Sequence, residues 1–121
     1  MQAAWTTVCE FDALLPDVGV RALVGDDQVA VFRLSRPAGV FAIDAFDPFS
    51  DAPVLSRGIV GDVKGQLVVA SPIYKQHFDL RTGRCLEDGT VVVRTFPVRV
   101  VDGRVQVRHQ SRAGSRRPVK A

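Results

Sequence analysis

Cysteine and histidine, the side chains that most often bind transition metals or act as nucleophile and base, are scarce in this chain. Its 121 residues include two cysteines, Cys9 and Cys85, and two histidines, His77 and His109. The cysteines lie far apart in the sequence and neither belongs to a Cys-x-x-Cys motif, so the case for a disulfide framework is weak. We expect both thiols to be reduced and either buried or half-buried.

Long apolar runs are missing as well. No run approaches the roughly 20 residues that a helix needs to span a bilayer. The first residues have no basic stretch, and Glu10 and Asp12 come early, which is unlike a secretory signal. We therefore expect a cytoplasmic protein that has no membrane partner.

The sequence motifs of the common enzyme classes are also absent. The chain has no G-x-S-x-G, no Walker loop, no G-x-G-x-x-G and no H-E-x-x-H. A nucleophile pair of Cys85 and His77 is possible, but Cys85 follows a turn at Thr82 and Gly83, as an ordinary strand cysteine would. We expect His109 to be a solvated residue at the end of the last strand. Three carboxylates lie close together in the sequence: Asp44, Asp47 and Asp51. Positions in solvated turns explain these carboxylates as well as a catalytic role does. We predict no catalytic residue on this chain.

Positive charge is concentrated at the C-terminus. The chain has 16 Lys and Arg against 13 Asp and Glu. Four of these cations and no acid follow residue 109: Arg112, Arg116, Arg117 and Lys120. We predict one domain over residues 1–109 and a basic flexible tail over 110–121. The tail could be an arm that binds nucleic acid, but no aromatic platform accompanies it, so we expect no nucleic-acid partner.

Strand signals dominate the domain. Short runs rich in Val, Ile, Phe and Thr are separated by turn residues. The expected strands cover 5–11, 20–24, 28–34 and 39–46, with two more between 58 and 71 around a turn at Lys64 and Gly65. Residues 25–27 suit a hairpin with a longer loop, and one turn of helix over 12–15 ends at Pro16. The fold class is therefore all-β.

The segment 96–108 gives the clearest hairpin. Asp102 and Gly103 form the signature of a two-residue type I′ turn, which sets the register of the two flanking strands. One face then holds Val98, Val100, Val105 and Val107, and the other holds Arg99, Val101, Arg104 and Gln106. We expect the valine face to lie on a core.

Two longer segments resemble the cluster-binding boxes of Rieske iron–sulfur domains. They are AIDAFDPFSDAPVLSRG over residues 42–58 and VVASPIYKQHFDLRTGRCLEDG over 68–89. The shared frame residues are Asp44, Pro48, Pro53, Leu55, Gly58, Pro72, Phe78, Asp79, Thr82 and Gly83. The resemblance covers roughly residues 30–107. It implies a Rieske-like fold of stacked small antiparallel sheets, with a former cluster-binding subdomain over about 44–84.

The four ligand positions of that family are replaced here. Asp47 and Phe49 stand where the first box has Cys-x-His, and Ser71 and Tyr74 stand where the second has Cys-x-x-His. A Rieske cluster needs two thiolates on one iron and two imidazoles on the other. The resemblance therefore implies no cluster, no metal and no cofactor on this chain. A mononuclear site that adds His77 would have a single nitrogen ligand among oxygens, which is poor transition-metal chemistry.

The run Ser-Pro-x-Tyr-Lys-Gln at 71–76 is similar to one family in particular, the small subunits of assimilatory NAD(P)H-dependent nitrite reductases. In that family the large subunit carries FAD, an iron–sulfur cluster and sirohaem, and reduces nitrite to ammonium with NAD(P)H. The resemblance implies a non-catalytic subunit, inactive alone, that docks on the large subunit and stabilises it. The alternative is a cluster-free interaction module of another multicomponent oxidoreductase or oxygenase.

In this family the two box loops form an exposed tip. An apolar cluster rimmed by polar groups is typical of a partner interface. The interface candidates are Phe49, Ile73, Tyr74, Lys75, Gln76 and His77. The alternative is that the apolar ones, with Pro48 and Pro72, fill the space that a cluster would occupy, and that the Tyr74 hydroxyl bonds across the loops.

Overall fold

Three small antiparallel sheets make up the computed structural model, which describes residues 4–110. The strands are β1 (Trp5–Glu10), β2 (Gly19–Val24), β3 (Asp27–Ser35), β4 (Ala38–Asp44), β5 (Ile59–Val63), β6 (Gln66–Ala70), β7 (His77–Asp79), β8 (Val98–Val101) and β9 (Arg104–Arg108). Two short 3-10 helices, η1 (Phe11–Ala13) and η2 (Leu55–Arg57), interrupt them. The prediction of an all-β fold of small antiparallel sheets is confirmed. The predicted tail, apart from Gln110, lies outside the described residues.

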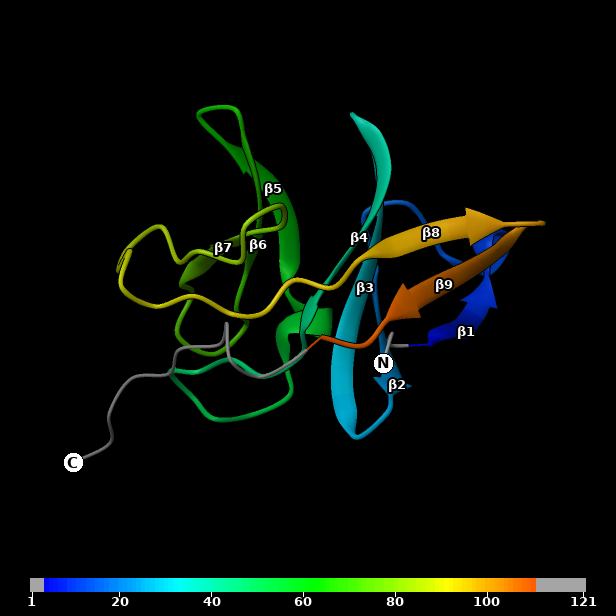
Figure 1. Ribbon diagram of the computed structural model, residues 1–121. Coiled ribbons are helices and arrows are strands. Elements are labelled where there is room, and N and C mark those ends of the chain that lie inside the picture. The colour runs from blue at the N-terminus through cyan, green and yellow to red at the C-terminus, as the bar shows by residue number, and fades with distance from the viewer. Residues whose placement is uncertain (1–3, 111–121) are drawn as a thin grey trace.

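The sheet β2–β3–β4 lies between the sheets β1–β9–β8 and β5–β6–β7 (Figure 1). Side chains alternate along a strand, so β3 presents residues to both neighbours. Ala30, Phe32 and Leu34 pack in an inner core with the β5–β6–β7 sheet. Val29 and Val31 pack in a second core beneath β9. Burial on both faces explains why β3 reads as a nearly continuous apolar run.

The predicted strands form, and one loop differs from the prediction. The turn at Lys64 and Gly65 joins β5 to β6, and both residues have positive φ, as a type I′ turn requires. The β2–β3 hairpin closes through two residues, Gly25 and Asp26, and not through the longer loop that we expected. The turn of helix that we predicted over 12–15 forms as η1, which begins one residue earlier and ends at Ala13.

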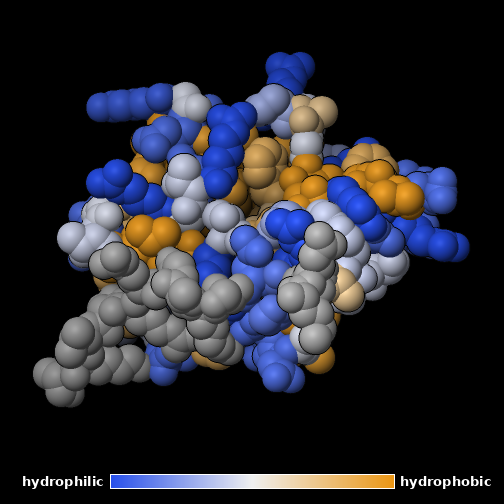
Figure 2. Space-filling model, viewed as in Figure 1, coloured by the Kyte–Doolittle hydropathy of each residue, from blue (hydrophilic) through white to orange (hydrophobic). Residues whose placement is uncertain are grey.

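The β8–β9 hairpin has the predicted register, from Val101 opposite Arg104 to Val98 opposite Val107. Val105 and Val107 are buried in the second core, as expected. Val100 departs from the prediction, because β8 is an edge strand and this side chain remains 45% exposed. Figure 2 shows the resulting apolar patch over β8.

A buried arginine joins segments that are far apart in the sequence. The Arg94 guanidinium donates two hydrogen bonds to Asp27, both of 2.9 Å, and one of 3.1 Å to Asp44. It also donates to the carbonyl of Gln110, and His109 lies 2.7 Å from the same Asp27 carboxylate. The hydrogen bonds with Asp27 and Asp44 outweigh burial and raise the pKa of Arg94, so the group stays charged. The explanation of Asp44 and Asp47 as solvated turn carboxylates is wrong, because both are buried. His109 is half-exposed, as a solvated residue would be, but it is also paired with Asp27.

The thiols behave as predicted. Cys85 is buried and Cys9 is half-buried, and neither forms a disulfide. Among the described residues no helix is long and apolar enough to cross a membrane.

The substitution Arg94→Ala tests the arginine network. It removes the guanidinium from two buried carboxylates, of which Asp27 keeps another partner in His109, so we expect the free energy of unfolding to fall by about 3–5 kcal/mol. Chemical denaturation measures this. The control Arg104→Ala removes an exposed partner of Glu10 at 3.7 Å and should cost less than about 1 kcal/mol. Equal losses for the two variants would contradict the structural role of Arg94.

Candidate functional site

The two segments that resemble cluster-binding boxes are joined by a hydrogen bond between Ser71 and Asp47. The Ser71 hydroxyl donates to Oδ2 of Asp47 over 2.5 Å. Both residues are fully buried. They occupy the two positions where the family resemblance puts the thiolates of one iron. A hydroxyl–carboxylate bond therefore connects the loops at the place where a metal would connect them.

Three six-residue loops share one hydrogen-bond pattern, and this bond joins two of them. We call them the first loop (47–52), the second loop (71–76) and the third loop (79–84). In each, the N–H of the first residue donates to the carbonyl of the sixth, over 2.9 Å in all three. The carbonyl of the first residue accepts from the N–H of the fifth, over 2.7, 3.1 and 2.7 Å respectively. Every fifth residue has positive φ: Asp51, Lys75 and Gly83.

The side chain that opens each loop also caps it. Oδ1 of Asp47 accepts the N–H of Phe49, and the Ser71 hydroxyl accepts the N–H of Ile73. Asp79 does the same for Arg81 in the third loop. Such side-chain bonds to the N–H two residues on are a property of Asp and Ser at turns. Each loop is thus fixed by its own hydrogen bonds, and the Ser71–Asp47 bond fixes the first two loops to each other.

The residues at the two former imidazole positions differ in burial. Phe49 is partly buried and packs on the inner core, with its ring centroid 6.2 Å from that of Phe78. Tyr74 is 59% exposed, and Ile73 beside it is 45% exposed. The Tyr74 hydroxyl makes no hydrogen bond to any described residue, so the bridge between the loops comes from Ser71 and not from Tyr74.

A further exposed residue, Ile59, was missed in the sequence. It opens β5 directly opposite Ala70, the residue that precedes the second loop. Its side chain is 74% exposed, which is unusual for isoleucine. The available signal was an apolar residue directly after Gly58, and that signal could not show which side of the strand would remain uncovered.

The Glu87 carboxylate forms hydrogen bonds with both His77 and Cys85. The carboxylate accepts the N–H of His77 and lies 2.6 Å from its Nδ1, and the Cys85 thiol donates to the same group over 3.7 Å. Burial works to raise the pKa of Glu87, but the hydrogen bonds from His77 prevail and the pKa is lowered. Burial, the largest effect, raises the pKa of Cys85. A buried thiol with a raised pKa is a poor nucleophile, so the geometry does not support a Cys–His pair.

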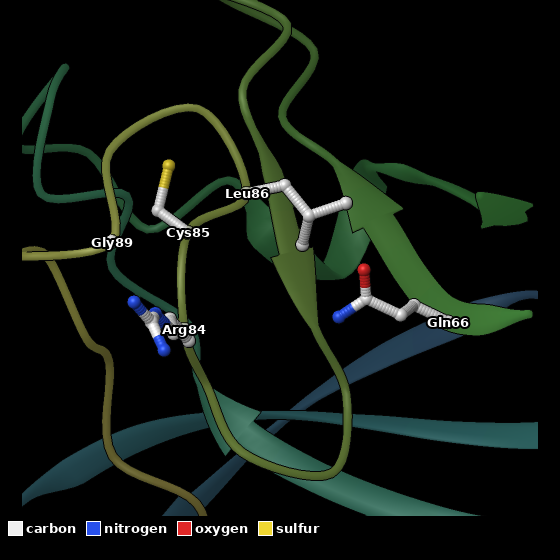
Figure 3. Close-up of a pocket in the computed structure, with 5 residues that line it drawn as sticks. All are labelled: Gln66, Arg84, Cys85, Leu86 and Gly89. Atoms are coloured by element: carbon white, nitrogen blue, oxygen red, sulfur yellow. The ribbon is translucent and has the colours of Figure 1, made fainter. Parts of the chain in front are cut away.

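A shallow hollow of about 280 Å³ lies next to Cys85, between β6 and the segment that follows β7. Gln66, Arg84, Cys85, Leu86 and Gly89 line it (Figure 3). The sulfur of Cys85 points toward the loop between Leu86 and Gly89 (Figure 3), and Cys85 is buried.

The donor set does not fit a [2Fe–2S] cluster. Such a cluster needs soft thiolate ligands, and Asp47 and Ser71 offer oxygen atoms that already bind each other. Phe49 has no donor atom, and its ring is packed against Phe78. Within residues 4–110 no group of three or more His, Cys, Asp or Glu side chains is placed to hold a metal ion.

Ser71→Ala tests the bond between the loops. It leaves a fully buried carboxylate oxygen without a donor, so we expect the free energy of unfolding to fall by about 1–3 kcal/mol. The matched control is Ser35→Ala, which removes an exposed hydroxyl 2.9 Å from Asp17 and should cost less than about 0.5 kcal/mol. If denaturation shows the same small loss for both, the Ser71–Asp47 bond does not hold the loops together.

Comparisons with known proteins agree with this geometry. The profile of the Rieske-like [2Fe-2S] domain family matches residues 4–108. The NADH nitrite reductase small subunit of Escherichia coli K12 is 48% identical over 104 residues, which are 86% of this chain and 96% of that protein. The large subunit of the NAD(P)H nitrite reductase of Klebsiella oxytoca is 42% identical over 106 residues, 88% of this chain but 11% of that protein.

A solved structure gives the same result. A crystal structure from Mycobacterium tuberculosis, assigned as an NADH-dependent nitrite reductase small subunit, superimposes with a TM-score of 0.85. It is 49% identical in sequence, and the match covers 90% of this chain and 97% of that one. The chain therefore belongs to the Rieske-like [2Fe-2S] domain family and, within it, to the small subunits of NAD(P)H-dependent nitrite reductases.

Proposed function

We propose that this chain is the non-catalytic small subunit of a cytoplasmic NAD(P)H-dependent nitrite reductase that reduces nitrite to ammonium. Electron transfer would take place on the large subunit, through FAD, an iron–sulfur cluster and sirohaem. The observation that carries the proposal is the match to the Escherichia coli small subunit over nearly its whole length. The chemistry of the site supports it, since the two former thiolate positions hold oxygen donors that bind each other and residues 4–110 place no group of ligands to hold a metal ion.

The large subunit is the partner that the comparisons favour. A region similar to this chain lies within the Klebsiella oxytoca large subunit, so both modules occur there in one polypeptide. Modules that share a chain in one protein are natural partners when they are separate in another. The alternative is an interaction module for a different oxidoreductase or an oxygenase. It is less favoured, because the anthranilate 1,2-dioxygenase ferredoxin subunit of Burkholderia cepacia is 32% identical to this chain, against 48% for the Escherichia coli small subunit.

The contact surface in this proposal is the tip formed by the first and second loops. Ile73 and Tyr74 are exposed apolar side chains on a turn held by backbone hydrogen bonds, so little conformational entropy is lost when they bind. Phe49 anchors the first loop on the inner core, and Ile59 is an exposed apolar residue opposite Ala70, directly before the second loop. Lys75, Gln76 and His77 supply the polar rim. The role of this chain is to hold a rigid tip against the large subunit and stabilise it.

Tyr74→Ala and Ile73→Ala test this surface in the co-expressed complex. Each removes an exposed side chain from a preformed turn, so the fold should be unchanged and the affinity for the large subunit should fall by about tenfold or more. Affinity is measured with purified subunits, and NAD(P)H-dependent nitrite reduction is measured with and without this chain.

The control is Leu23→Ala, which removes a side chain that is 66% exposed on β2, outside the tip. It should bind the large subunit like the unaltered chain. If both tip variants bind normally, the tip is not the interface. If the unaltered chain neither binds the large subunit nor raises its activity, the proposed function is wrong.

A further inference from the structure

The second loop contains a backbone conformation that its residue does not favour. The fifth residue of each six-residue loop lies in the left-handed region, with φ of 58° at Asp51, 68° at Lys75 and 79° at Gly83. Glycine adopts this region without cost, and aspartate adopts it more readily than most residues because its short side chain can bond locally. Lysine has neither advantage. Lys75 is therefore the strained member of the three.

Within residues 4–110 the Lys75 side chain has no compensating polar contact. Lys75 is exposed, and its ammonium makes no ion pair or hydrogen bond with any described residue. Its backbone N–H closes the loop by donating to the carbonyl of Ser71, but glycine would make the same bond without strain. Residues held in sparsely populated conformations concentrate at functional sites, where the side chain is needed for something outside the fold.

The position of Lys75 indicates what it contacts. It follows directly after Ile73 and Tyr74, the exposed apolar pair, and it is the only charged residue of the second loop. We propose that Lys75 presents its ammonium to a carboxylate on the large subunit, at the edge of an apolar pocket that receives Tyr74. This inference rests on the proposed function and adds the chemistry of the partner surface: an apolar floor with an acidic group at its rim.

The other lysine among the described residues supplies a matched control. Lys64 also has positive φ, 51°, but it lies in the β5–β6 turn before Gly65, where a type I′ turn requires that conformation. A left-handed backbone conformation alone therefore does not identify a lysine as a binding residue. What distinguishes Lys75 is its place beside the apolar pair.

The experiment compares Lys75→Gly, Lys75→Glu and Lys64→Gly in the full chain, with the purified large subunit as the probe. Each glycine variant removes one positive charge and relieves one strained backbone conformation. We expect both to have an equal or higher melting temperature than the unaltered chain. Lys75→Gly should bind the large subunit about tenfold more weakly, Lys75→Glu more weakly still, and Lys64→Gly with unchanged affinity. The affinity of Lys75→Gly should also depend less on salt than that of the unaltered chain.

Two results would overturn the inference. In one, Lys75→Gly binds as tightly as the unaltered chain, so Lys75 makes no contact that matters. In the other, both glycine variants lose affinity equally, so only the total charge is felt. Either result leaves the proposed function standing as long as the unaltered chain binds the large subunit. Failure of the unaltered chain to bind would instead refute the proposed function and, with it, this inference.

Discussion

The hydrogen bond between Ser71 and Asp47 is the interaction on which the tip of this protein depends. Both residues are fully buried, and they stand where the family resemblance places the thiolates of one iron. A polar group buried without a partner costs far more than a satisfied one, so neither side chain can be lost alone. The fold thus keeps the arrangement of a metal site and replaces the metal with an oxygen–oxygen contact.

The rest of the tip follows from this constraint. The first loop is fixed at Asp47 by Ser71, and the strand that leads into it ends at Asp44, which the buried guanidinium of Arg94 holds. Internal hydrogen bonds then close each loop, which leaves Ile73 and Tyr74 exposed on a rigid turn. A cluster-binding domain needs its loops to hold iron. A docking subunit needs only their shape, and the shape is what this chain retains.

Local patterns in the sequence predicted the local structure well. The type I′ signature and the alternating valines defined the β8–β9 hairpin, and its register was correct. The partners of Arg94 could not be found in this way, because Asp27 and Asp44 lie 67 and 50 residues away and look like ordinary turn carboxylates. We predicted that Tyr74 would make the hydrogen bond between the loops, but Ser71 makes it. The sequence shows which residues belong to the two loops, but it does not show where each side chain points.

The iron content of the chain tests most directly whether the Ser71–Asp47 bond has taken the place of a cluster. The full-length protein would be expressed anaerobically with iron and cysteine supplied, purified, and then treated with iron and sulfide under reconstitution conditions. We expect no stoichiometric iron and no visible absorption of a cluster, because the site offers oxygen donors that are already bonded to each other. A stable content of about two irons per chain, with the spectrum of a [2Fe–2S] centre, would contradict it.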